Sequence, residues 1–333
     1  KGPTIQEYDQ EGVVAPYNID SIAQSEGWDN LLDPMIAAIH KCENNSGPYC
    51  AAPVNIHRID WMWANKAVFD ANGISVPTTW DELNAAAEKL KAAGIIPFAH
   101  GGQAWQDATV FEAVAMGLGG NNYYKNCYVD LKESCLRSET TVKVFDQMRK
   151  LQSYTDEGSP GRDWNVATGM VIEGKAGFQI MGDWAKGEFT AAGKVPGVDY
   201  YCAATPSNNG YLYNVDSFIF YKSSDPDKQA GQQLLAKLMM GKNFQKVFNL
   251  YKGSIPARLD VSMDEFDKCA KTSNADIKTA GAKGGLVPSF AHGMAQGNTM
   301  KAALQDIITE HFNSDMSSVD AANALADSVL ANM

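Results

Sequence analysis

Trp184 stands where a large aromatic side chain could contact a ligand. The preceding residues 176–181 read Ala-Gly-Phe-Gln-Ile-Met, an apolar run that predicts a strand buried inside a parallel sheet. Gly182 and Asp183 then predict a turn, and a helix is expected to begin after Trp184. Open α/β sheets bind ligands beyond the carboxyl ends of their strands, and a flat ring there could stack on the C–H face of a sugar. The alternative is a core tryptophan that caps the sheet.

The sequence offers little for catalysis. It contains no Gly-x-Ser-x-Gly, no His-Glu-x-x-His and no glycine-rich phosphate loop. Asp183 and Glu188 could form the acid/base pair of a glycosidase. Because they are five residues apart across a turn and a helix start, an interaction with that helix amino terminus is the better interpretation. We therefore expect no enzymatic activity.

The six cysteines indicate an oxidising compartment. Cys42 and Cys50 enclose a segment of turn-forming residues, and Cys127 and Cys135 have the same separation. Six cysteines allow 15 pairings. The simplest is 42–50, 127–135 and 202–269, which pairs Cys202 with Cys269; six free thiols in a cytosolic protein are the alternative. No cysteine or histidine cluster has the spacing of a zinc site, so we expect no metal and no cofactor.

Composition and charge limit the possible partners. The chain has 333 residues, enough for two domains, and a net charge of −11. Since no run rich in lysine and arginine occurs, nucleic-acid binding is not expected. No apolar run reaches the roughly 18 residues that span a membrane. The first residue is Lys and no signal region follows, as expected of a processed chain or part of one.

Short apolar strands alternate with longer amphipathic helices, which predicts an α/β fold. Thr79 and Glu82 form a capping box at the start of a helix over residues 80–93. Strands are expected at residues 50–56, 59–64, 95–100 and 212–221. Further helices are expected at 65–72, 141–154, 228–250 with a break near Gly241, and 300–333 as a pair. Without a linker, two lobes joined by several strands fit better than separate domains.

Several motifs resemble one family along the whole chain. Residues 60–83 combine Asp-Trp-Met-Trp-Ala-Asn-Lys with a later Thr-Trp-Asp-Glu-Leu, and residues 173–185 hold Glu-Gly-Lys-Ala-Gly followed by Gly-Asp-Trp-Ala. Residues 250–258 read Leu-Tyr-Lys-Gly-Ser-Ile-Pro-Ala-Arg. These segments resemble the sugar-binding extracellular solute-binding proteins of ABC importers. Asn-Val-Asp-Ser at 214–217 and Pro-Ser-Phe-Ala-His-Gly at 288–293 resemble the periplasmic glucose-binding members.

The resemblance implies a cleft in which polar side chains replace the water that surrounds sugar hydroxyls. It implies this ligand-binding set: Lys1, His57, Asp107, Trp184, Asn214, Asp216, Lys252 and His292. Asp216 would accept two hydroxyls, Lys252 would donate, and neutral His292 could do both. Solvated loop residues are the alternative for Lys252 and His292. Surface pairing is an equally good alternative for His57.

The resemblance also implies a fold and partners. The fold would be two-lobed, each lobe a mostly parallel sheet flanked by helices. One lobe would hold residues 1–102 and 217–270, and the other residues 103–216 and 271–333. Closure of the lobes on glucose or a close monosaccharide would create the form that a membrane permease recognises. We expect a periplasmic monomer. A binder of a longer saccharide or another solute is the alternative.

Family members normally have residues that precede the segment beginning at Lys1. Those residues would supply the first strands of the amino-terminal lobe and an aromatic pair lining the cleft. We therefore expect that lobe to lack inner strands. Lys1, at a turn that enters a helix with Pro3 in its first turn, is expected near the mouth of the cleft.

Overall fold

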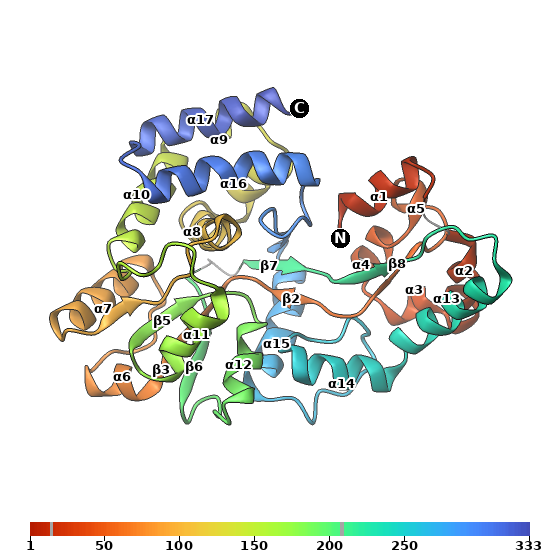
Figure 1. The fold of residues 1–333 in the computed structure, drawn as a ribbon, viewed down its shortest axis with the longest axis horizontal. Coiled ribbons are helices and arrows are strands. Elements are labelled where there is room, and N and C mark those ends of the chain that lie inside the picture. Colours follow the sequence, from red (N-terminus) through yellow and green to blue (C-terminus); the bar gives the residue numbers. More distant parts are fainter. Residues whose placement is uncertain (14–15, 207–209) are drawn as a thin grey trace.

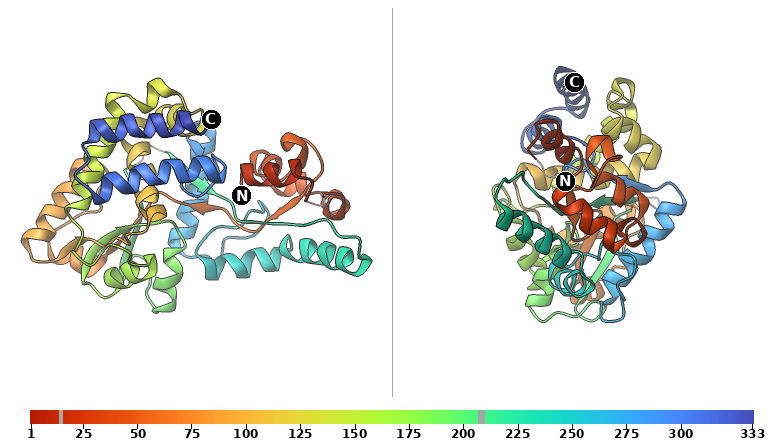
Figure 2. Two further views of the ribbon diagram at one scale, coloured as in Figure 1. Left: turned by 45° about the horizontal axis from the view of Figure 1, so that its top comes forward. Right: turned by 90° about the vertical axis from the view of Figure 1, so that its right-hand side faces the viewer.

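Two lobes and three connecting strands make up the computed structural model, which describes residues 1–13, 16–206 and 210–333 (Figure 1). The small lobe consists of α1 Pro3–Gln10, α2 Pro16–Glu26, α3 Trp28–Leu31, α4 Pro34–Ile39, α5 Cys42–Asn45, β1 Ala51–Pro53, β8 Ser217–Ile219, α13 Pro226–Met239, α14 Lys242–Lys252 and α15 Lys268–Ala282. The lobes stay distinct when the molecule is turned about its horizontal axis, and they meet at the centre (Figure 2).

The large lobe is built around a four-stranded sheet. Its elements are β3 Trp61–Asn65, α6 Lys66–Ala71, α7 Trp80–Ala92, β4 Ile96–Phe98, α8 Ala104–Tyr124, η1 Lys125–Val129, α9 Glu133–Leu136, α10 Glu139–Gln152, α11 Trp164–Ile172, β5 Ala176–Ile180, α12 Ala185–Ala191, β6 Tyr200–Ala204, α16 Asn298–Asn313 and α17 Ser318–Ala331. The strand order is β4-β5-β3-β6.

Local sequence signals place several of these elements. The Thr79 hydroxyl accepts the backbone N–H of Glu82, and the Glu82 carboxylate accepts the backbone N–H of Thr79, so the expected capping box is confirmed. The expected break near Gly241 separates α13 from α14. Trp184 is the cap residue of α12, directly after β5, as the sequence predicts. The strand expected at 212–221 is instead divided into β7 and β8.

The expectation of mostly parallel sheets is wrong. In the large lobe β4 and β5 are parallel, but β3 runs antiparallel to both β5 and β6. The small lobe has the antiparallel pair β1–β8. An apolar run such as 176–181 shows that a strand is covered on both faces. It does not fix the direction of the neighbouring strand, which depends on pairing far away in the sequence.

A three-stranded sheet connects the lobes. β2 His57–Arg58 pairs antiparallel with β7 Tyr211–Asn214, and β7 pairs parallel with β9 Leu286–Pro288. His57 lies opposite Asn214, and Tyr213 lies opposite Pro288. The carboxyl ends of β7 and β9 and the amino end of β2 therefore meet at one edge. Residues at this edge face the space between the lobes.

The expected division into lobes is wrong for residues 59–102. Leu83 and Phe98 share a core with Phe111 and Phe178 in the large lobe. Residues 268–282, mostly assigned to the other lobe, form α15, whose Ala270 and Ala280 pack in the small-lobe core with Ile36. Local patterns locate helices and strands, but the points at which the chain crosses between lobes are set by long-range pairing.

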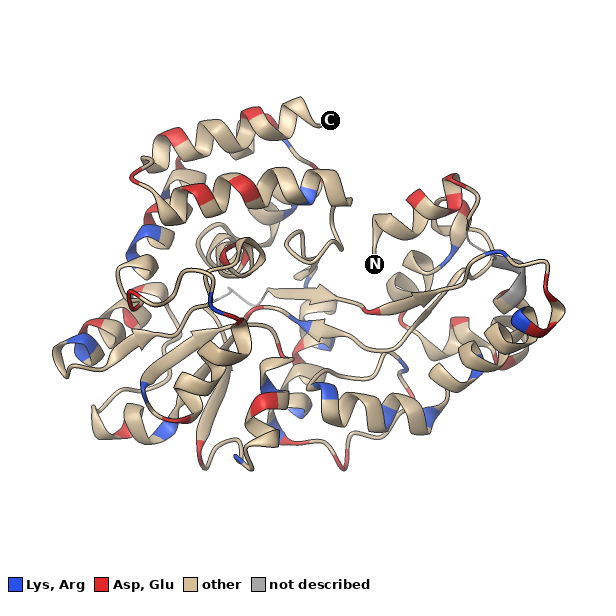
Figure 3. Cartoon of the chain, in the orientation of Figure 1, with Lys and Arg blue, Asp and Glu red and all other residues tan. Residues whose placement is uncertain are grey.

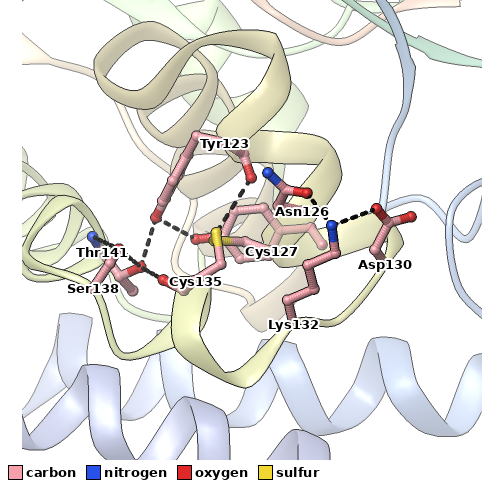
Figure 4. Close-up of a disulfide and its surroundings, with 9 residues drawn as sticks. Tyr123, Asn126, Cys127, Asp130, Lys132, Cys135, Ser138 and Thr141 are labelled. Atoms are coloured by element: carbon pink, nitrogen blue, oxygen red, sulfur yellow. Dashed lines mark hydrogen bonds and ion pairs between the residues drawn. A yellow bond between two sulfur atoms is a disulfide. The ribbon is translucent and has the colours of Figure 1, made fainter.

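All six cysteines are paired as expected: 42–50, 127–135 and 202–269. Figure 4 shows the second bridge, where Thr141 at the start of α10 donates a hydrogen bond of 2.9 Å to the carbonyl of Cys135. Cys202 on β6 joins Cys269 on α15, so this bridge links the two lobes. Along the ribbon, the positions of lysine and arginine are interspersed with those of aspartate and glutamate (Figure 3).

Candidate functional site

A cavity of about 590 Å³ lies between the lobes. Its lining residues are Lys1, His57, Trp105, Trp164, Trp184, Gly187, Glu188, Ala191, Asn214, Asp216, Tyr251, Lys252 and His292. The helices of the large lobe contribute most of the aromatic residues. The small lobe contributes Lys1 and Lys252, and the connecting sheet contributes the buried polar groups.

The connecting sheet positions the polar groups of the cavity. His57 and Asn214 are cross-strand partners on β2 and β7, and both are buried. Asp216 comes two residues after Asn214, on the same side of the extended chain. The Asn214 Oδ1 atom is buried and has no hydrogen-bond partner among the described residues. An unpaired buried acceptor in a cavity wall is costly unless a ligand or water satisfies it.

His57 lies between two carboxylates. Its Nδ1 contacts Asp183, and its Nε2 lies 2.9 Å from Oδ2 of Asp216. Burial disfavours the charged imidazole, but the two carboxylates outweigh burial and raise the pKa of His57. Asp216 also bonds Lys1 Nζ at 2.7 Å. Burial opposes ionisation of Asp216, yet His57 and Lys1 hold its pKa well below the usual value. The site thus keeps an ionised carboxylate with a fixed orientation.

His292 has a lowered pKa and is neutral, whereas the pKa of His57 is raised. Burial, together with the nearby cations Lys1 and His57, lowers its pKa to about 3. Its Nε2 lies 2.9 Å from the hydroxyl of Thr109, and that hydroxyl donates to the carbonyl of Trp105 at 2.7 Å. Because the hydroxyl proton is already used, we assign the proton of His292 to Nε2. Its Nδ1 is then a hydrogen-bond acceptor.

Trp184 is the centre of an aromatic group. Its ring lies 5.3 Å from that of His57, 5.0 Å from that of His292 and 6.4 Å from that of Trp105. The Trp184 ring folds back over Gly182, where a Cβ atom would come within 2.3 Å of it. Gly182 is thus needed for the ring to lie against the end of β5. One part of the ring is buried, and the rest faces the cavity.

Seven of the eight expected site residues line the cavity, namely Lys1, His57, Trp184, Asn214, Asp216, Lys252 and His292. Lys1 lies at this cavity, as expected. Asp107 does not line it and is fully buried in the large lobe. Its carboxylate contacts Thr309 and lies 2.7 Å from Nε2 of His100. Asp107 lies on α8 rather than in a loop at the hinge, so its assignment is wrong.

Other residues were missed or misread from the sequence. Trp105 and Trp164 each lie at the start of a helix and line the cavity, so they share the signal that identified Trp184. Tyr251 was missed because it follows the apolar pattern of α14, yet its side chain is 79% exposed. Asp183 turns toward His57 and accepts the backbone N–H of Arg58 at 2.9 Å. The expected interaction with the start of α12 is not the one observed.

The described residues also bear on metal binding and membrane insertion. No group of three or more histidine, cysteine or acidic side chains in residues 1–13, 16–206 and 210–333 is arranged to hold a metal ion. Within the same residues, no helix combines the length and apolar character needed to cross a bilayer.

Comparison with known proteins gives strong matches. A model of the family described as bacterial extracellular solute-binding protein matches residues 1–239. A probable sugar-binding periplasmic protein of Brucella suis is 45% identical over 329 residues, which are 98% of this chain and 76% of that protein. A probable sugar-binding periplasmic protein of Rhizobium meliloti is 44% identical over 329 residues, 98% of this chain and 78% of that protein.

Solved structures share the fold at low sequence identity. A bacterial solute receptor with a preference for β-D-galactopyranose has a TM-score of 0.84 at 18% identity, covering 99% of this chain and 83% of that one. A chitin oligosaccharide binding protein has a TM-score of 0.79 at 17% identity, covering 98% and 80%. The two-lobed architecture is therefore that of solute-binding proteins.

Proposed function

The chain belongs to the bacterial extracellular solute-binding protein family, and from this premise we propose that it is the periplasmic sugar-binding subunit of an ABC importer. We propose further that its ligand is glucose or a closely related monosaccharide. The lobes would close on the sugar by a hinge motion about the connecting sheet. A membrane permease would then recognise the closed form.

The observation that carries the proposal is the pairing of polar and aromatic groups in one cavity. Asp216, Asn214 and His292 offer acceptors from one edge of the connecting sheet, and Lys252 offers a donor. Trp184 and Trp105 offer ring faces from the large lobe. A sugar needs both kinds of contact, because its hydroxyls must regain the hydrogen bonds they had with water.

A longer saccharide is the second candidate. Tyr251 has a largely exposed ring at the cavity, and it could stack on a second sugar unit. An enzyme is less well supported. Asp183 is engaged by His57 and Arg58 and does not line the cavity, so the pair with Glu188 lacks one member. Incubation with disaccharides and analysis of released sugar would test for turnover.

A thermal-shift and calorimetry screen tests the proposal. The panel is glucose, galactose, mannose, xylose, glucuronate, maltose and cellobiose. A ligand that binds only the folded state stabilises that state by about 2.7 kcal/mol when its free concentration is about 100 times its Kd. We expect glucose or another neutral monosaccharide to give the largest shift. A shift with disaccharides alone would favour the longer ligand, and no shift with any sugar would contradict the proposal.

A further inference from the structure

Glu112 is a fully buried acid on α8 that the proposed sugar site does not use. It does not line the cavity. Its carboxyl group contacts residues 288–292, which comprise the end of β9 and the turn after it and include His292. A buried acid with no cation among its hydrogen-bond partners requires an explanation, because ionisation without a charged partner is costly in the interior.

Two hydrogen bonds link the Glu112 carboxyl group, through the Ser289 hydroxyl, to the backbone of His292. The hydroxyl of Ser289 donates to Oε1 of Glu112 at 2.7 Å. The same hydroxyl oxygen accepts the backbone N–H of His292 at 3.0 Å. A weaker bond of 3.4 Å runs from the N–H of Ala291 to Oε2. Glu112 therefore organises the turn that presents the His292 ring to the cavity.

The hydroxyl of Tyr124 indicates where a proton resides. It accepts the N–H of Phe290 at 3.1 Å and has two acceptors in reach, Oε2 of Glu112 at 2.9 Å and the carbonyl of Pro288 at 3.2 Å. One hydroxyl proton cannot serve both acceptors fully. If Glu112 carries a proton on Oε2, it donates to Tyr124, and Tyr124 donates to Pro288. All of these groups are then satisfied.

A kink in α8 makes this arrangement possible. In a straight helix, residues 112 and 124 would be about 18 Å apart along the axis. Gly120 has φ of 75° and ψ of 178°, which interrupts the helix and lets the following turn fold back. Only glycine adopts such a conformation without strain. The tyrosine ring thus returns to the glutamate twelve positions before it.

We propose that Glu112 is a positioning residue for the cleft: as a protonated carboxylic acid it holds residues 288–292 so that His292 faces the ligand. Its ionisation in mildly alkaline solution would turn the Tyr124 hydroxyl toward the carboxylate, leave the carbonyl of Pro288 without that donor and weaken ligand binding. The ligand readout rests on the proposed sugar-binding function, whereas the protonation of Glu112 is independent of it.

The surroundings of Glu112 favour the protonated form. Burial raises its pKa to about 8, although Ser289, Tyr124 and the N–H of Ala291 act in the opposite direction. Asp60, from the segment between β2 and β3, adds to the increase through its negative charge. The 288–292 segment contributes the neutral His292 but no charged side chain. A change of protonation is therefore expected near pH 8.

Two measurements test the inference. Infrared difference spectra of the ligand-free protein report the carbonyl stretch of a protonated carboxylic acid. We expect such a band at neutral pH in the wild type and its absence in Glu112→Gln. Calorimetry then follows the affinity for the best ligand of the sugar screen from about pH 7 to about pH 9. We expect a loss of roughly fivefold in the wild type.

The variants separate positioning from general stability. Glu112→Gln keeps a donor for Tyr124 and has no side-chain proton to lose, so its affinity should stay constant from pH 7 to pH 9. Ser289→Ala removes the link to His292 and should weaken binding at every pH. Glu88→Gln is the control, because Glu88 also bonds a tyrosine hydroxyl, but there the exposed carboxylate accepts the bond, from Tyr154 at 2.9 Å. It should keep the wild-type profile.

Each outcome has a clear meaning. An absent infrared band overturns the inference whether or not any sugar binds. A band without sugar binding contradicts the proposed function and leaves Glu112 protonated. An alkaline loss that persists in Glu112→Gln assigns the loss to another group and overturns the positioning role. If Glu112→Gln does not fold, the profile of Ser289→Ala decides, since a pH dependence equal to that of the wild type would refute the link.

Discussion

At the scale of single residues, the cleft depends on charges that are matched within a few ångströms. Asp216 is bonded by both His57 and Lys1, and His57 is bonded by Asp183 as well. This alternation of charges keeps Asp216 ionised and fixes the direction of its oxygens. Carboxylates with an imposed orientation lose less entropy on binding than free ones.

We expect Asp216→Asn to weaken monosaccharide binding at least tenfold, about 1.4 kcal/mol. The amide replaces one acceptor oxygen by a donor and leaves His57 with a single carboxylate. Titration calorimetry is the measurement. Asp260→Asn is the matched control, because Asp260 also has two cationic partners, Arg258 and Lys242, but lies outside the cleft. An equal effect of both substitutions would show that only stability had changed.

Trp184→Ala should weaken binding about tenfold without unfolding the protein. The ring is only partly buried, so its removal costs stacking area against the ligand more than core packing. Quenching of tryptophan fluorescence and calorimetry measure the affinity, and Trp184→Phe should recover part of it. An unchanged affinity in Trp184→Ala would identify the ring as a cap of the sheet and nothing more.

At the scale of elements, α15 connects the lobes. Its core residues pack in the small lobe, but Cys269 is bonded to Cys202 on β6. Its cap residue Asp267 bonds the buried Lys186 of α12 at 3.0 Å, and Asp276 bonds Arg58 at 2.6 Å. The three bonds restrain the position of α15 relative to the large lobe and the connecting sheet. The lobes must therefore move about this helix and the connecting strands.

Removing the Cys202–Cys269 bridge by double substitution with serine should lower the free energy of unfolding by about 4 kcal/mol in the chain-entropy account. The bridge closes a separation of 67 residues, whereas Cys42–Cys50 closes one of eight. Double substitution of Cys42 and Cys50 with serine should lower the free energy of unfolding by about 2.5 kcal/mol. Urea unfolding of both variants checks the order. Equal losses would show that strain or residual structure outweighs loop length.

Elements defined by local chemistry could be predicted from the sequence. The capping box of Thr79, the break at Gly241 and the position of Trp184 after β5 depend on neighbouring residues. The direction of β3 and the lobe of residues 59–102 depend on pairing between strands that lie far apart in the sequence. Asp107 was misplaced for a similar reason, because the sequence does not show that Thr309, which is 202 positions away, contacts its carboxylate.

At the scale of the whole molecule, the cleft unites residues from three parts of the chain. His57, Asn214 with Asp216, and His292 arrive on successive crossings between the lobes. The sequence identified these residues through family resemblance, but their common origin in one sheet edge is visible only in the fold. Each crossing brings at least one polar group, so a hinge motion changes the site and the lobe arrangement together.

Acid should destabilise the protein through buried neutral histidines. His40 donates from Nδ1 to the carbonyl of Ile36 at 2.6 Å, and burial lowers its pKa to about 4. The folded state thus resists protonation of His40 below the unfolded pKa near 6.5. Its contribution to stability is complete above about pH 6.5 and is lost as the pH falls toward 4, on the order of 3 kcal/mol.

The substitution His40→Gln isolates this contribution, because a glutamine does not titrate. Urea unfolding at pH 7, 6, 5 and 4 gives the free energy of unfolding of both proteins. The wild type should lose more stability than the variant between pH 6.5 and 4, even if the variant is less stable at pH 7. Parallel pH profiles would mean that His40 has the same pKa in the folded and the unfolded state. Other groups titrate in the same range, so the difference between the two profiles is the decisive quantity.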